Sequence, residues 1–268
     1  MKRRPLSGTT PEISVSSLGL GTVKFGRNAQ VKYPEPFDLP SDQDILNLLE
    51  VAQSEGINLL DTAPAYGTSE ERIGKLLAPA ERENWAIVTK AGEEFVDGGS
   101  IFDFSNEAIT KSVERTLTRL NTDRIEAVLL HSSGEDVDIL QNTGAVEALF
   151  ELKAAGKIRA IGISTKTVEG GKLALEMGLD AVMTTYNPWH TEEEPVLDTA
   201  AEIGKSVFLK KALGSGWFGS GDTGDDPVFE AFDFIFKHPG ATAVIAGTIN
   251  PEHLRSNCEA MRRVEAQA

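Results

Sequence analysis

The segment Leu59-Leu60-Asp61-Thr62-Ala63-Pro64-Ala65-Tyr66-Gly67 (residues 59–67) passes from two apolar residues to a carboxylate, a proline-containing turn and a tyrosine. Two later apolar runs also end in a titratable side chain, in one case Lys90 and in the other His131. Short apolar runs of this kind are typical of buried strands. We therefore interpret Asp61, Tyr66, Lys90 and His131 as groups that strand ends bring together into one proton-transfer site.

Similar runs recur along the whole chain and alternate with segments of helical periodicity. The predicted strands are residues 18–22, 58–61, 86–90, 127–131, 160–164, 181–186, 207–211 and 243–248. The predicted helices are residues 42–54, 69–77, 106–120, 144–155, 168–177, 192–203, 227–236 and 251–264. Eight alternating units predict the fold class α/β and, within it, a closed (β/α)8 TIM barrel with active residues after the strands. An open doubly wound sheet is the rival, but no strand is followed by the Gly-x-Gly-x-x-Gly turn of a Rossmann fold.

Several segments outside this alternation have a predicted place on the barrel. Residues 5–10 and 12–15 flank a Gly-Thr turn and predict an N-terminal β-hairpin that closes the lower end. The irregular segments 25–40, 91–104 and 214–226 are candidate substrate walls or plain surface insertions. Aromatic residues in the upper loops predict an apolar pocket, although packing explains each one equally well: Tyr33, Phe95, Trp189, Trp217 and Phe218.

Composition narrows the class of protein. The chain has 268 residues, 40% of them hydrophobic, which predicts a single domain over residues 1–268. Its net charge of -15 argues against a nucleic-acid or anionic-membrane surface, since binding phosphate needs a basic face. The single cysteine, Cys258, rules out an intrachain disulfide and suggests a reducing compartment. With no apolar signal core or membrane-length run, the expectation is a soluble cytoplasmic protein.

Several short motifs, taken together, resemble the aldo-keto reductase family. They occur in family order from residue 18 to residue 257: Asp61-Thr62-Ala63 with Tyr66-Gly67, Thr89-Lys90, Leu129-Leu130-His131, Ile161-Gly162-Ile163-Ser164, and a closing segment from Gly247-Thr248 through Asn250-Pro251-Glu252-His253-Leu254 to Asn257. The resemblance implies a (β/α)8 barrel that binds an extended nicotinamide dinucleotide and reduces small carbonyl compounds to alcohols. It implies no metal ion.

The four opening residues fit that chemistry. Hydride addition to a carbonyl leaves a developing alkoxide that needs a proton and nearby positive potential. Tyr66 is the proposed acid, and because a free phenol has a pKa near ~10, an adjacent cation helps it to release its proton. Lys90 would supply that cation, and Asp61 would hold Lys90 in place. His131 would donate a hydrogen bond to the carbonyl oxygen, the role that the family implies.

The resemblance also implies a set of cofactor-binding residues. Gly21, Thr22 and Lys24 would lie along the ribose and pyrophosphate, and Ser164 and Thr165 would reach the carboxamide. The segment from Gly247 would cradle the adenosine half, where a helix N-terminus attracts phosphate. The full predicted set is Gly21, Thr22, Lys24, Asp61, Ser164, Thr165, Lys210, Gly247, Thr248, Asn250, His253 and Asn257.

Three positions depart from the family pattern around the nicotinamide. Thr165 and Met183 stand where many members have asparagine and glutamine, and Lys210 stands where many have an aromatic ring that stacks on the nicotinamide. Gly247 and His253 stand where some members have a lysine and an arginine for the 2'-phosphate. NADP(H) is therefore expected from the family alone, and NAD(H) is not excluded.

Two other classes of function stay open from the sequence. Lysines at strand ends, such as Lys90, Lys210 or Lys211, form Schiff bases when burial lowers their pKa, which would suit a lyase. A barrel that binds the dinucleotide without turnover would suit a regulatory role. The physiological substrate, the direction of the reaction and the oligomeric state are not encoded in any motif.

Overall fold

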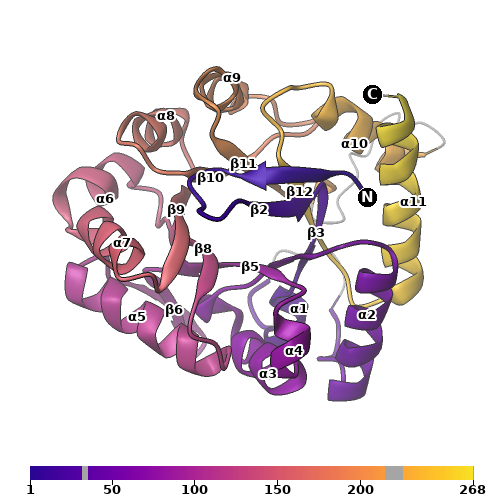
Figure 1. Ribbon diagram of the computed structural model, residues 1–268, viewed down its shortest axis with the longest axis horizontal. Coiled ribbons are helices and arrows are strands. Elements are labelled where there is room, and N and C mark those ends of the chain that lie inside the picture. The colour runs from indigo at the N-terminus through magenta and orange to yellow at the C-terminus, as the bar shows by residue number, and fades with distance from the viewer. Residues whose placement is uncertain (32–35, 215–225, 268) are drawn as a thin grey trace.

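The computed structural model describes residues 1–31, 36–214 and 226–267. Eight parallel strands pair in the order β10-β11-β12-β3-β4-β5-β8-β9 and close into a barrel surrounded by helices (Figure 1). Their bounds are β3 Leu18–Gly21, β4 Leu59–Asp61, β5 Ala86–Ala91, β8 Ile125–His131, β9 Ile158–Ser164, β10 Ala181–Thr185, β11 Ser206–Lys210 and β12 Ala243–Gly247. The TIM-barrel prediction is confirmed, and each predicted strand is present with small shifts at its ends.

The described helices include all eight predicted ones. Their bounds are α1 Val23–Gly26, α2 Asp42–Ser54, α3 Ser69–Leu76, α4 Pro79–Arg82, α5 Asn106–Arg119, α6 Asp136–Asn142, α7 Ala145–Ala154, α8 Val168–Glu176, α9 Glu194–Ile203, α10 Pro227–Phe236 and α11 Pro251–Gln267, with a 3-10 turn η1 Pro64–Tyr66. Side-chain caps begin several of them: Ser41 accepts from the Asp44 amide and Ser105 from the Ala108 amide. The short helices α1, α4 and α6 were not predicted. None of the helices in the described ranges is both long and apolar enough to cross a membrane.

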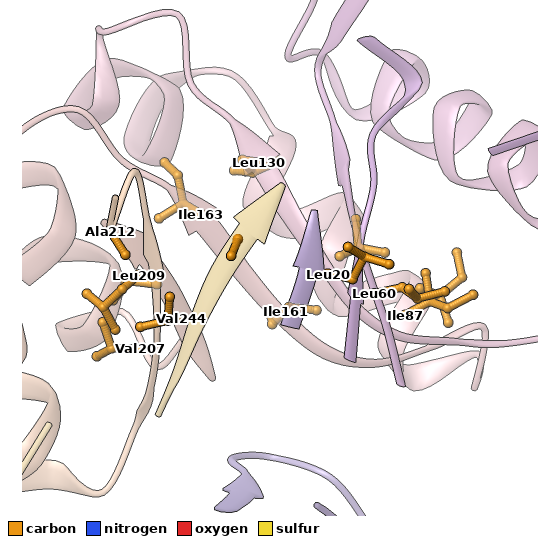
Figure 2. Close-up of a cluster of buried hydrophobic side chains, with 14 of the residues drawn as sticks. Leu20, Leu60, Ile87, Leu130, Ile161, Ile163, Val207, Leu209, Ala212 and Val244 are labelled. Atoms are coloured by element: carbon orange, nitrogen blue, oxygen red, sulfur yellow. The ribbon is translucent and has the colours of Figure 1, made fainter. Parts of the chain in front are cut away.

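The strands have two buried faces with different partners. Outward residues such as Leu20, Leu60 and Ile87 (Figure 2) belong to the same cluster as residues of the surrounding helices. The inward cluster is made from the alternate strand positions: Leu59, Ala86, Val88, Ala127, Leu129, Ala160, Ala181, Met183, Phe208 and Ala243. Side chains alternate between faces along a strand, so the position within a run decides which layer a residue joins.

The predicted N-terminal hairpin is present as β1 Arg3–Leu6 and β2 Ile13–Ser16, paired antiparallel. Leu6 and Val15 are buried in the inward cluster of the barrel. The hairpin also donates from the Ser7 amide to Ser206 Oγ, at the first residue of β11. It therefore covers the amino end of the barrel, away from the strand ends that carry the predicted site (Figure 1).

The segment 91–104, interpreted from the sequence as a loop, is instead largely a second hairpin, β6 Glu93–Val96 and β7 Gly99–Phe102. Asp97 and Gly98 join the two strands with φ angles of 51° and 79°. Two positive φ angles are what a tight two-residue hairpin turn requires, and Asp-Gly is a strong signal for it. The strands themselves were missed because Glu93 and Glu94 are not typical strand residues.

Candidate active site

Strand periodicity places three of the predicted catalytic residues on one side of the barrel wall. Each follows an inward-facing apolar residue by two positions: Leu59 precedes Asp61, Val88 precedes Lys90, and Leu129 precedes His131. The three strands β4, β5 and β8 are neighbours in the barrel. Their carboxyl ends therefore bring a carboxylate, an ammonium and an imidazole to the same rim.

Lys90 and Asp61 form a buried ion pair there. Lys90 Nζ lies 2.6 Å from Asp61 Oδ1 and also donates to the Thr62 carbonyl at 2.8 Å. The exposed fractions are only 2% for Lys90 and 4% for Asp61. Two oxygens thus hold the ammonium in one position and compensate its burial, which is costly for an unpaired charge.

Tyr66 ends the turn η1 and lies against both Lys90 and His131. Lys90 Nζ is 4.7 Å from the centroid of the Tyr66 ring, within the range of a cation–π contact. The rings of Tyr66 and His131 meet edge to face, with centroids 6.3 Å apart. The structure therefore brings all four predicted catalytic residues together.

Gly67 makes the close turn that follows Tyr66 possible. Its φ angle is 64°, and a Cβ there would lie 2.2 Å from the Gly26 carbonyl oxygen. We expect Gly67→Ala to displace the Tyr66 turn and lower the kcat of any reaction that depends on Tyr66 by about a hundredfold. Gly178→Ala is the matched control, because φ is 89° there and no atom lies within 4 Å of the added Cβ. Similar kcat values for the two variants would contradict the prediction.

Glu93, on β6, is the acidic neighbour of His131. Its Oε2 lies 2.7 Å from His131 Nδ1, so the carboxylate contacts the imidazole directly. Burial lowers the pKa of His131 below its ordinary value, while Glu93 opposes that shift and Lys90 adds to it. Burial raises the pKa of Glu93, yet His131, Ser100 and Arg27 outweigh it and bring the pKa to about 2. Near neutral pH the site thus holds an ionised carboxylate beside a neutral imidazole.

A cavity of about 850 Å³ opens over these residues. The four predicted catalytic residues line it, together with predicted cofactor residues from other strand ends: Gly21, Ser164, Thr165, Lys210 and Gly247. Gly21 and Gly247 are register partners on β3 and β12, so two side-chain-free positions lie side by side in the wall. A ligand can approach the backbone closely at that point, and hydroxyl and ammonium donors face it from β9 and β11.

The other predicted cofactor residues lie outside the described wall of this cavity. Thr22 is buried and bonds to the Asp61 carbonyl and to Ser69 Oγ, which ties β3 to β4. Lys24 lies with its ammonium over the Phe37 ring. The remaining four lie just before α11 or within it: Thr248, Asn250, His253 and Asn257.

The start of α11 is capped by its own residues. Asn250 Oδ1 accepts from the amides of Glu252 and His253, and Thr248 Oγ1 accepts from the Asn250 amide. This is the plain N-cap pattern, with Pro251 at the first helical position. The geometry accounts for these residues structurally, and their contact with a cofactor stays a prediction.

Lys210 ends β11 and points its ammonium at β9. Nζ donates to Ser164 Oγ at 3.0 Å and to the Thr165 carbonyl at 2.5 Å. Burial lowers the pKa of Lys210 to about 8, with Glu193 opposing and Lys211 and Lys90 adding to the shift. The Lys210 ammonium therefore lies beside Ser164 and Thr165, the two residues that the family resemblance implies as contacts of the nicotinamide carboxamide.

Sequence reasoning missed several polar residues in the wall, including Arg27, Glu93, Ser100 and Glu193. Arg27 lies over the Phe95 ring at 3.6 Å and donates to the Ala65 carbonyl. The Asp-Gly turn was the sequence signal for the hairpin that carries Glu93 and Ser100. Glu193 is the middle one of three consecutive glutamates, and nothing in the sequence distinguishes it from its neighbours.

The predicted aromatic pocket has limited support in the described residues. Trp189 is 42% exposed and does not line the described cavity, and Phe95 is covered by Arg27. Tyr33, Trp217 and Phe218 lie outside the described residues. Phe102 is the aromatic contribution of β7 to the wall, among mainly polar neighbours.

Comparison with known proteins gives a consistent result. Residues 17–231 match the model of the Aldo/keto reductase family. A NADH-specific methylglyoxal reductase from Escherichia coli is 34% identical over 215 residues, which are 75% of this chain and 61% of that protein. This chain thus spans about three fifths of that relative. An aldo-keto reductase from Bacillus subtilis is 31% identical over 85% of this chain and 67% of its own length.

A solved structure from Pseudomonas aeruginosa, described as an aldo-keto reductase, has a TM-score of 0.87 and 49% sequence identity. The match covers 98% of this chain and 96% of that one.

Proposed function

The chain belongs to the aldo-keto reductase family, and on that premise we propose that it is a nicotinamide-dependent oxidoreductase that reduces aldehydes or ketones to alcohols. One observation carries the proposal. The Lys90–Asp61 pair, at 2.6 Å, places a buried ammonium 4.7 Å from the centroid of the Tyr66 ring and beside His131. An acid, a cation and a hydrogen-bond donor around one point are the groups that reduction of a carbonyl requires.

Tyr66 gives its proton to the carbonyl oxygen as negative charge develops there. Lys90 favours release of that proton by stabilising the phenolate, and Asp61 keeps the ammonium in position. His131 offers the ring nitrogen that does not face Glu93 as the hydrogen-bond donor to the same oxygen and so orients the substrate. Because the carbonyl oxygen is held from this side, the carbon faces the open part of the cavity.

The residues that face the cavity fit a nicotinamide dinucleotide, which supplies the hydride when bound. The paired glycines Gly21 and Gly247 leave room against the wall, and Ser164 and Lys210 offer donors to a carboxamide. An approach of about 3 to 3.5 Å between the hydride donor and the carbonyl carbon is needed for transfer. Tyr66 and His131 therefore define where the reactive edge of the ring must lie.

The family resemblance predicts NADP(H), but the charges near α11 support NADH as an equally good donor. Arg255, a candidate for a 2'-phosphate, is already paired with Glu55 at 2.7 Å, and Glu252 lies 4.0 Å from it. We expect kcat/KM with NADH to equal or exceed that with NADPH. Glu55→Gln removes the charge that pairs with Arg255 and should shift the ratio toward NADPH. A wild-type preference for NADPH of tenfold or more would contradict this prediction.

The experiment that tests the function is loss of NADH or NADPH absorbance with a panel of small aldehydes and ketones. Turnover of any carbonyl at a rate above the buffer control is expected. Binding of both dinucleotides with no turnover across the panel would contradict the reductase and favour the regulatory alternative.

A Schiff-base lyase would have to use Lys210 or Lys211, because Lys90 is held by Asp61 and Thr62. Lys210 lines the cavity, and its pKa of about 8 would suit that chemistry. Borohydride reduction in the presence of the panel, followed by intact mass, checks this alternative. The reductase proposal expects no adduct.

A further inference from the structure

Lys210 is held differently from Lys90. Both of its hydrogen-bond partners, Ser164 Oγ and the Thr165 carbonyl, are uncharged. In the described ranges of the chain, no carboxylate lies within ion-pair distance of its ammonium, whereas Lys90 has Asp61 at 2.6 Å. The positive charge of Lys210 is thus left without a direct counter-charge in the wall of the cavity.

The two nearest acidic influences on Lys210 are occupied by other donors. Glu193 accepts from the Thr185 amide and from the Thr184 hydroxyl. Asp136 accepts from the amides of Lys166 and Thr167 at 2.9 and 2.8 Å. Both carboxylates weaken the positive electrostatic potential of the Lys210 ammonium, but neither contacts it directly.

Lys90 and Lys210 lie on two sides of the cavity. Lys90 lies near the carboxyl end of β5 and Lys210 ends β11, on opposite sides of the closed barrel, and both line the same cavity. If the proposed function holds, the ring must lie near Tyr66 and His131, over the mouth of the barrel. Lys90 is neutralised by Asp61, whereas Lys210 brings a positive charge that no described carboxylate pairs with directly. Arg27, Lys166 and Lys211 add further cations to the lining of the cavity.

The oxidised nicotinamide ring carries a positive charge and the reduced ring does not. On this difference, which rests on the proposed function, we propose that Lys210 makes the site select the reduced dinucleotide over the oxidised one. Two unit charges several ångströms apart at a partly buried site repel strongly enough to change an affinity ratio by about tenfold. With this selectivity, the protein binds the reduced dinucleotide preferentially from a mixture of both forms. The oxidised dinucleotide also dissociates faster after the reaction.

The test is the ratio of dissociation constants, Kd for NAD⁺ over Kd for NADH, measured by titration calorimetry at pH 7. Lys210→Met removes the charge, Lys210→Arg keeps it, and Lys172→Met removes a charge from the exposed face of α8 as a matched control. We expect the ratio to exceed one in the wild type and to fall about tenfold in Lys210→Met, mainly through tighter NAD⁺ binding. Lys210→Arg and Lys172→Met should keep the wild-type ratio.

A second measurement uses the unmodified protein. Because a lysine is charged below its pKa and neutral above it, a pKa of about 8 predicts that the ratio falls between pH 7 and pH 9. The groups that act on Lys210 are Glu193, Asp136, Lys211, Lys90 and the nearby His131, whose lowered pKa keeps it neutral over that range. The Lys210→Met variant should lose this pH dependence.

The outcomes separate the two proposals. If wild type and Lys210→Met have the same ratio of dissociation constants, and that ratio does not change with pH, the proposed selectivity for the reduced dinucleotide is contradicted. The proposal that the protein is a reductase is not affected by this result. If the wild type binds no dinucleotide at all, the proposed function is overturned and the selection falls with it.

Discussion

Tyr66→Phe should lower kcat for carbonyl reduction by about 10² to 10⁴-fold, the usual contribution of a positioned acid. The variant keeps the ring that contacts Lys90 and His131 and loses the hydroxyl that donates the proton. Affinity for the dinucleotide should change by less than about threefold, because the loss concerns the transition state rather than cofactor binding. Steady-state kinetics with the best carbonyl of the panel, together with titration of NADH, measures both quantities.

A control for Tyr66 separates loss of the acid from loss of the fold. Tyr186 is a buried tyrosine outside the predicted catalytic set; its hydroxyl contacts Glu194, and burial and that carboxylate raise its pKa to about 12. Tyr186→Phe should leave kcat within about threefold of the wild type. Equal activity of Tyr66→Phe and the wild type would assign the proton to another group.

We expect Lys90→Met to lower the free energy of unfolding and to abolish turnover. The substitution leaves the Asp61 carboxylate buried without its ammonium, and breaking a buried pair in this way costs about 3 to 5 kcal/mol. The same change removes the cation beside the Tyr66 ring. Urea unfolding followed by circular dichroism gives the free energy of unfolding, and NADH oxidation gives the rate.

The double variant Lys90→Met with Asp61→Asn isolates the two effects. Removing both charges should restore most of the lost stability, because the penalty comes from the unpaired carboxylate. Activity should stay as low as in the single variant, because the cation is still absent. A Lys90→Met protein as stable as the wild type would show that the pair is not buried in solution as it is in the structure.

The local patterns were enough to predict the barrel and the four residues at its rim. Apolar runs that end in Asp61, Lys90 and His131 predict strands, and the structure confirms them as β4, β5 and β8. The pattern works because a strand end and its polar residue are neighbours in sequence. Tyr66 was found for the same reason, since its turn follows β4 directly.

The surroundings of those residues could not be predicted in the same way. Glu93 meets His131 only because the β6–β7 hairpin turns back over the rim. Arg27 reaches the Ala65 carbonyl, next to Tyr66, across 38 positions of sequence. Lys210 bonds to Ser164 across 46 positions. No local pattern encodes such pairs, because they depend on which strand ends meet when the barrel closes.

Local sequence patterns predict the alternation of strands and helices, the N-terminal hairpin and the residue types at the strand ends. These follow from hydrophobic periodicity and from residues adjacent in the chain. The contact of Glu93 with His131 and the lack of an ion-pair partner for Lys210 among the described residues follow from the tertiary structure alone. The physical reason is that charge interactions depend on distance in space, and closing eight strands sets distances that separation along the chain does not.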